Sequence, residues 1–68
     1  MSASMGLVAQ LVAIRKAKGI KQVVVARRIG VTRPAVSQFE SGKYSPNLAN
    51  LIRYAEAVGA RIVVEEIQ

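Results

Sequence analysis

The first regular hydrophobic pattern in the chain covers residues 7–18. Its apolar positions recur at helical spacing: Leu7, Leu11 and Ile14. Gly19 follows directly and is a common helix end. Val8 and Val12 occupy a neighbouring face, where they either widen the buried stripe or form a contact surface. Residues 1–6 are small or polar and show no periodic pattern, so we expect them to form a flexible N-terminal tail.

Residues 22–29 fit two kinds of structure. The three consecutive valines at residues 23–25 favour a strand, and Lys21 is a poor helix N-cap. The apolar positions nevertheless form a helical stripe: Val25, Ala26 and Ile29. Because Arg27 and Arg28 then provide a polar side, we interpret the segment as a short helix.

A turn and a third helix follow. Gly30 allows the positive φ that a sharp reversal between two helices needs. Thr32 is a good N-cap, and Pro34 falls in the first helical turn, where its missing N–H is harmless. We therefore expect a helix over residues 33–41. Its inward-facing positions are Val36 and Phe39.

The fourth helix is predicted over residues 48–58. Asn47 provides an N-cap after the loop at residues 43–46, and Gly59 ends the helix. The apolar positions form one stripe: Leu48, Leu51, Ile52, Ala55 and Val58.

The C-terminal residues 60–68 begin with the β-branched sequence ARIVVEEI, which predicts one strand. A lone strand beside helices leaves its backbone groups unpaired. We therefore expect two copies to pair their strands antiparallel across a two-fold axis. The residues assigned to this dimer contact are Ile62, Val63, Val64 and Ile67. A loose tail or a fifth short helix is the alternative. The expected fold is mainly α, with four compact helices and one strand paired between subunits.

Composition limits the kinds of function. A chain of 68 residues is one small domain, and without Cys or His it has no disulfide and no ordinary zinc site. The net charge is +6, and residues 1–53 hold nine Lys or Arg but a single acid, Glu40. This asymmetry favours a polyanionic partner such as nucleic acid, although solvated surface charge is the alternative for any single residue.

The sequence shows no sign of a membrane-spanning segment or of a catalytic site. No apolar run approaches the ~20 residues that span a bilayer, and the N-terminus lacks the basic start of a signal peptide. We therefore expect a cytoplasmic protein, in a bacterial cell or a phage-infected host. The absence of His, Cys and Asp, with four scattered Glu, shows no catalytic pair, so neither enzymatic activity nor a cofactor is expected.

The chain resembles the lambda-repressor-like helix-turn-helix family, of the Cro/Xre type. The resemblance covers residues 11–59, and these positions carry it: Arg15, Gly19, Ile20, Gln22, Ala26, Ile29, Gly30, Val31, Val36, Glu40, Ser41, Gly42, Lys43, Pro46, Leu51, Ala57, Val58 and Gly59. It implies a DNA-binding domain over residues 7–59, and it supports a helix at residues 22–29.

The resemblance also implies roles for individual residues. The exposed, base-reading positions of the recognition helix are Thr32, Arg33, Pro34, Ser37 and Gln38. The positions that contact phosphate are Gln22, Ser41, Gly42 and Lys43, to which the charge pattern adds Lys21 and Arg28. Arg15 and Glu40 match an ion pair that joins the first helix to the third.

Two departures from the family pattern affect this interpretation. Val23 and Val24 stand where members usually have polar residues. Pro34 occupies a reading position but offers no side-chain hydrogen bond, so direct reading depends on Arg33, Gln38 and Ser37. In the major groove Arg33 can contact a guanine edge, and Gln38 an adenine edge.

The predicted function is a sequence-specific regulator that binds double-stranded DNA at a two-fold operator. The simplest form is a repressor, such as a phage immunity or Cro-like protein. The alternative is an antitoxin, which would bind a toxin protein in addition to its operator. Val8, Val12, Val23 and Val24 could then serve a protein partner.

Overall fold

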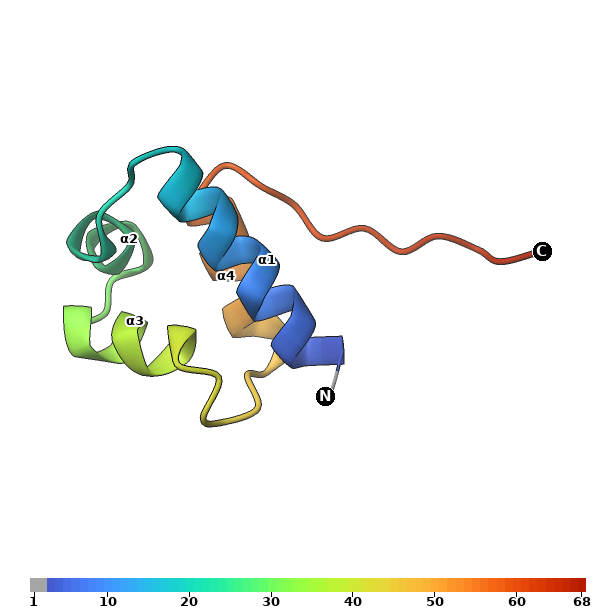
Figure 1. Cartoon of the computed structure of the whole chain (residues 1–68), viewed down its shortest axis with the longest axis horizontal. Helices are drawn as coiled ribbons and strands as arrows, with labels where there is room; N and C mark the ends of the chain where they lie inside the picture. Colours follow the sequence, from blue (N-terminus) through green and yellow to red (C-terminus); the bar gives the residue numbers. More distant parts are fainter. Residues whose placement is uncertain (1–2) are drawn as a thin grey trace.

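The computed structural model describes residues 3–68 and contains four helices (Figure 1). Their bounds are α1 Ala3–Ala17, α2 Gln22–Ile29, α3 Arg33–Glu40 and α4 Leu48–Ala57. α2 and α3 lie together at one end, and α4 packs against both α1 and α2. The helical interpretation of residues 22–29 is correct. None of the described helices is long and apolar enough to cross a membrane.

α1 begins at Ala3, so the predicted tail is wrong for residues 3–6. The hydrophobic pattern begins only at Leu7, which hid the earlier start. Extending an existing helix adds one hydrogen bond per residue without a new nucleation step, so α1 continues through Gly6 although Gly is a poor helix former. Residues 1 and 2 of the predicted tail lie outside the described residues.

The reversal between α2 and α3 forms around Gly30. Its φ of 85° is in the left-handed region, and the N–H groups of Gly30 and Val31 both donate to Ala26 O, at 2.8 and 2.9 Å. On the other side of the turn, Thr32 Oγ1 accepts from Ala35 N at 3.3 Å and begins α3. The predicted turn and N-cap are therefore both present, and together they fix the direction of α3.

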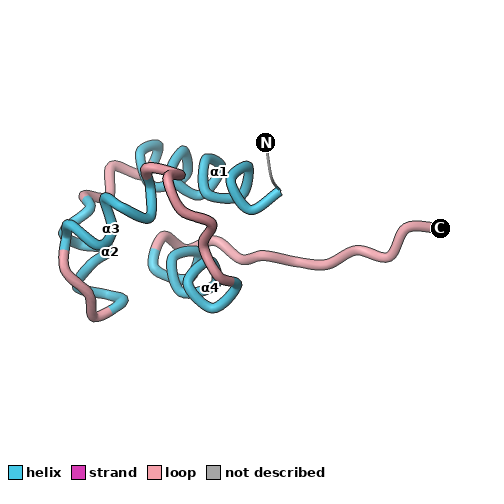
Figure 2. Tube along the Cα trace, turned by 90° about the horizontal axis from the view of Figure 1, so that it is seen from below, coloured by secondary structure: helices cyan, strands magenta, loops and turns pink. Residues whose placement is uncertain are grey.

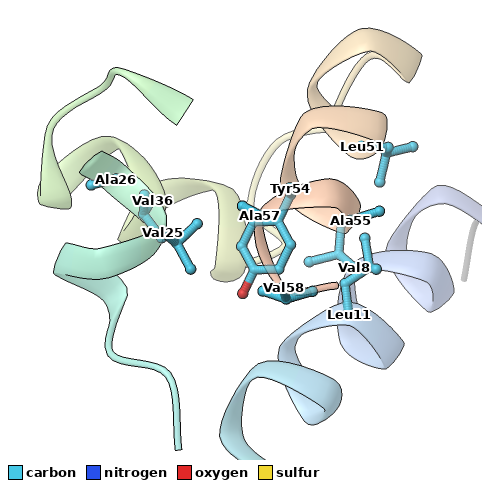
Figure 3. Packing of buried hydrophobic residues seen from close by; sticks show 10 residues of the cluster. All are labelled: Val8, Leu11, Val25, Ala26, Val36, Leu51, Tyr54, Ala55, Ala57 and Val58. Atoms are coloured by element: carbon cyan, nitrogen blue, oxygen red, sulfur yellow. The ribbon is translucent and has the colours of Figure 1, made fainter. Parts of the chain in front are cut away.

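The core lies between all four helices (Figure 3) and is aliphatic except for one Tyr. Its buried apolar members are Val8, Leu11, Val25, Ala26, Val36, Leu51, Tyr54, Ala55, Ala57 and Val58. Val8 is 2 % exposed and Val12 packs against the cluster, so these two valines widen the buried stripe of α1. Phe39 is partly buried against the same cluster.

The predicted apolar stripe of α4 is wrong at two positions. Leu48 is 63 % exposed and Ile52 is 40 % exposed. The buried face is centred on Leu51, Tyr54 and Val58, and both Leu48 and Ile52 lie beside it rather than on it. The predicted stripe leaves out Tyr54. Because Tyr54 is buried, the buried face of α4 lies further round the helix than predicted.

Residues 60–68 leave α4 as an extended segment that projects away from α2 and α3 (Figures 1 and 2). The N–H of Ala60 donates to Ala55 O at 2.8 Å, after which no backbone hydrogen bond is formed within the described chain. No strand is present among residues 3–68, because a single extended segment has no partner for a ladder. The predicted strand and its pairing between subunits stay predictions.

Candidate nucleic-acid interface

The outer face of α3 carries the residues expected to read bases. Arg33, Pro34 and Gln38 are exposed, and Ser37 is half-buried. The hydroxyl of Thr32 is exposed but already accepts the N–H of Ala35, so it is partly occupied as a helix cap. The helix therefore presents Arg33 and Gln38 as its two long polar side chains.

Arg33 is held by a residue of the preceding helix. Its Nη1 donates to Oε1 of Gln22 at 3.1 Å, and Nε2 of Gln22 donates to Oε1 of Glu40 at 2.9 Å. The amide of Gln22 thus links the start of α3 to its end. This fixes the orientation of the amide, because its oxygen faces a donor and its nitrogen faces a carboxylate.

Arg15 and Glu40 form the ion pair that the resemblance implied. Nε of Arg15 lies 2.7 Å from Oε2 of Glu40, and Nη2 donates to Oε1 at 2.9 Å. Nη1 of the same guanidinium donates to the carbonyl of Ile20 at 2.8 Å. The two charged side chains are 10 % and 8 % exposed, so the pair is well shielded from water. It joins α1 to α3 and to the loop before α2.

Tyr54 completes this network and was not predicted to take part. Its hydroxyl donates to Oε2 of Glu40 at 2.6 Å and accepts from Nε of Arg15 at 3.2 Å. Its ring stacks on Phe39, with centroids 4.9 Å apart and planes at 19°. A signal did exist in the sequence, because Tyr54 follows Leu51 at core spacing and a buried Tyr hydroxyl needs a polar partner.

The network shifts the pKa values of Glu40 and Tyr54. Burial acts to raise the pKa of Glu40, but the hydrogen bonds from Tyr54, Gln22 and Arg15 outweigh it and lower that pKa below its ordinary value. Burial and the hydrogen bond to Glu40 raise the pKa of Tyr54. Glu40 is therefore ionised at neutral pH, and Tyr54 is a neutral donor.

The segment after α3 forms a tight turn that is held by the side chain of Ser41. Oγ of Ser41 donates to Gln38 O at 2.7 Å and accepts from the N–H of Lys43 at 3.2 Å. Gly42 adopts a φ of 68°, and the side chain of Lys43 is exposed. The polar groups of Ser41 are thus partly used inside the turn, while the ammonium group of Lys43 remains open to solvent.

Two basic residues contact the C-terminus of α4. Nη1 of Arg28 donates to Ala57 O at 2.6 Å, and Nζ of Lys18 donates to Val58 O at 2.7 Å. Cations at this end of a helix interact favourably with its dipole. Arg28 is therefore not brought together with Gln22 and Arg33. Lys21 is exposed and directly precedes Gln22.

Comparison with known proteins gives a family and two kinds of relative. The family model described as Helix-turn-helix matches residues 11–63. Antitoxin HigA1 of Mycobacterium tuberculosis (strains CDC 1551 / Oshkosh and H37Rv) is 48 % identical over 56 residues, which cover 82 % of this chain and 38 % of the relative. An uncharacterized HTH-type transcriptional regulator of Methanothermobacter thermautotrophicus is 43 % identical over 53 residues, 78 % of this chain and 75 % of the relative.

The chain thus spans less than half the length of the antitoxins that it matches. No solved structure gives a significant match. The family match covers the turn at Gly30, the network around Glu40 and the exposed face of α3. The chain belongs to the helix-turn-helix family, in its lambda-repressor-like, Cro/Xre type.

Proposed function

We propose that this chain is a sequence-specific regulator of transcription that places α3 in the major groove of double-stranded DNA. The observation that carries the proposal is the position of Arg33. Its guanidinium is exposed at the start of α3 and is held on one side by Gln22. Because Gln22 is in turn fixed by the shielded carboxylate of Glu40, Arg33 is oriented before DNA arrives.

The chemistry of Arg33 suits a guanine edge. One N–H of Nη1 is donated to Gln22, and the remaining donors of the guanidinium are available for O6 and N7 of guanine. Gln38 offers the donor and acceptor that an adenine edge requires. Each good bidentate contact supplies about 1–3 kcal/mol of discrimination against the wrong base.

Contacts to phosphate would supply much of the affinity. Lys43, in the turn after α3, and Lys21, directly before α2, are both exposed. Together with Gln22 and the Ser41–Gly42 turn they fit the backbone on either side of the groove. Binding would then weaken steeply as salt rises, since each neutralised phosphate releases counterions.

A homodimer would read a two-fold related site, with half-site centres ~34–36 Å apart. The simplest output is repression by occupying the operator. The description of the chain as a phage immunity or Cro-like protein stays a prediction.

Selection of bound DNA from a random pool, followed by sequencing, tests the proposal. A two-fold related motif is the expected result. Arg33→Ala should then lose about tenfold to a hundredfold in affinity for that motif, and much less for random DNA. Arg27→Ala is the matched control, since Arg27 is exposed on α2 and its loss removes the same charge. Equal losses on both DNAs for Arg33→Ala would reduce Arg33 to a phosphate contact.

A second candidate function is that of an antitoxin, because the relatives from Mycobacterium tuberculosis carry that name at 48 % identity. Such a protein would bind a toxin as well as DNA. The neighbouring gene separates the two cases, since a small toxin frame favours an antitoxin and lysogeny genes favour a phage switch. Co-expression with the neighbouring gene product, followed by size-exclusion chromatography, would detect the complex directly.

A further inference from the structure

A groove runs along one flank of α4 and consists of two hollows that meet at Ile29. The first hollow is mainly apolar, and its wall includes residues of the turn, of α3 and of α4: Val31, Ala35, Phe39 and Asn50. The second hollow is more polar, and Ile29 lies on its wall as well. The two hollows together are called the α2–α4 groove below, because α2 and α4 pack against each other beside it.

The second hollow lies towards the C-terminal end of α4 and carries charge. Its wall holds Arg28 from α2 and three residues of the α4 segment: Arg53, Glu56 and Ala57. Both arginines are exposed, and Arg28 is held in place because its Nη1 donates to Ala57 O at 2.6 Å. Among the described residues the one ion pair belongs to the polar network between α1 and α3, so neither arginine is paired with Glu56. The hollow therefore presents two guanidinium groups and a single carboxylate.

The two hollows lie about one helical turn apart along α4. Asn50 and Arg53 are three residues apart, which is about 4.5 Å along the helix axis. Ala57, four residues after Arg53, continues the same flank. The exposed apolar residues Leu48 and Ile52 lie on a different flank of the helix. The groove thus places an apolar site and a cationic site at the spacing of neighbouring turns.

We propose that the α2–α4 groove binds a segment of a partner protein that carries an acidic and a large apolar side chain about one helical turn apart. The carboxylate lies between Arg28 and Arg53, because a guanidinium presents parallel N–H donors that match its two oxygens. The apolar side chain enters the first hollow beside Val31 and Phe39. Side chains at i and i+3 or i+4 of a helix are about 5–6 Å apart, which fits the two hollows. This inference goes beyond the proposed binding of DNA and does not depend on it.

The chemistry of the groove favours a protein over the backbone of a nucleic acid. A run of phosphates matches only the cationic hollow, because the adjoining hollow is mainly apolar and has no cation on its wall. Ala35 also lies about 160° around α3 from both Arg33 and Ser37, so the groove is not on the base-reading face. Partner and DNA can therefore be bound at the same time. Arg28 then contacts a carboxylate rather than the phosphate expected from the charge pattern.

Peptide selection tests the chemistry of the partner. A phage-displayed library of random peptides of about twelve residues, enough for three helical turns, is selected on the whole chain without DNA. The enriched peptides are expected to share an Asp or Glu three or four positions from a Leu, Ile, Met or Phe. Enrichment of peptides that lack an acid, or no enrichment at all, would overturn the inference.

Two substitutions then locate the bound peptide, which is synthesised with the enriched sequence and followed by fluorescence anisotropy. Arg53→Glu should weaken binding about tenfold, because it places a like charge against the carboxylate. Val31→Gln should also weaken it, because it places a polar amide on the apolar wall. Arg27→Glu makes the same charge change outside the groove, and Leu48→Gln the same kind of polar change on another flank of α4. Equal losses in a variant and its control would contradict binding in the groove.

Two further measurements separate a protein partner from other occupants of the groove. Random-sequence duplex DNA should not displace the peptide, and Arg53→Glu should not change the oligomeric state on sedimentation. Displacement would assign the groove to nucleic acid, and a changed oligomeric state would assign it to contact between copies, so either result refutes the inference. Operator binding is measured on the same preparation. A chain that binds its operator but no peptide loses this inference and keeps the proposed function.

Discussion

Arg33 at the surface and Arg15 in the core are joined by a continuous line of polar contacts. The line runs from Arg33 to Gln22, from Gln22 to Glu40, and from Glu40 to Arg15 and Tyr54. Every buried side-chain polar atom in the described part of the chain has a partner. Such a network is rigid when complete and costly when one member is lost.

The hydroxyl of Tyr54 can be removed without disturbing its ring. Tyr54→Phe keeps the stack on Phe39 but deprives Glu40 of the donor at 2.6 Å. We expect the free energy of unfolding to fall by about 1–3 kcal/mol, since a charged acceptor loses a bond in a shielded site. Tyr44→Phe is the control, because Tyr44 is 65 % exposed. Chemical denaturation of both variants measures the difference, and equal stabilities would argue against a structural role for the hydroxyl.

The ionised carboxylate of Glu40 should make the free energy of unfolding depend on pH in the acidic range. The pKa of Glu40 is lowered in the folded chain, because the bonds from Tyr54, Gln22 and Arg15 outweigh burial. Its contribution is therefore complete above the unfolded value of about 4.3 and is lost as pH falls below that value through the folded pKa. Melting curves between neutral pH and pH ~3 should show this loss. In Glu40→Gln that part of the pH dependence should disappear, and an unchanged profile would contradict the assignment.

Among the elements, α4 depends on residues from other helices at its C-terminus. Lys18, which directly follows α1, and Arg28 from α2 donate to the carbonyls of Val58 and Ala57 at this end. Four carbonyls at a helix end lack partners within the helix, so such donors replace water there. Gly59 also belongs to this end, since a Cβ at its position would lie 2.7 Å from Nζ of Lys18.

Replacing Arg28 tests whether its role is in the fold or on DNA. We expect Arg28→Met to lower the free energy of unfolding by about 1 kcal/mol, because it removes a charged donor at the α4 terminus. Arg27→Met, an exposed neighbour on the same helix, should leave stability nearly unchanged. The melting temperatures of the two variants are compared by thermal unfolding. Equal melting temperatures would mean that Arg28 does not contribute to the stability of the fold.

A substitution at Gly6 tests whether the first residues of α1 are helical in solution. It lies inside the helix with a negative φ, and the space that a Cβ would occupy at this position is open. Gly6→Ala should therefore raise the free energy of unfolding by about 0.5 kcal/mol, the usual preference for Ala within a helix. If residues 1–6 formed a flexible tail in solution, the substitution would have no effect. Circular dichroism during urea unfolding distinguishes the two outcomes.

At the scale of the whole molecule, the ten buried apolar residues among the side chains that the structure describes must hold the four helices together. Domains of this size bury a smaller share of their surface than larger ones and are marginally stable alone. Pairing of the exposed tail would add apolar burial, as well as backbone hydrogen bonds that the single chain does not make.

A dimer of this kind links folding to protein concentration. We expect the melting temperature to rise as the concentration is raised over about two orders of magnitude, because mass action favours the associated, folded state. A melting temperature independent of concentration would mean that folding does not require association.

Much of the helical architecture followed from local chemistry. The spacing of Leu7, Leu11 and Ile14, the caps at Thr32 and Asn47, and the positive φ at Gly30 each act over a few residues. Their consequences can therefore be read in order along the chain. Resemblance to a family then paired Arg15 with Glu40, which periodicity alone does not do.

The tertiary structure decided what depends on contacts between distant residues. Tyr54 becomes a core residue because Glu40 and Arg15 satisfy its hydroxyl, which moves the buried face of α4 away from Leu48 and Ile52. Arg28 joins the end of α4 because the fold brings Ala57 within reach. In both cases a polar group bonds to a partner more than ten residues away in the chain. The sequence alone does not show that these residues lie close together in space.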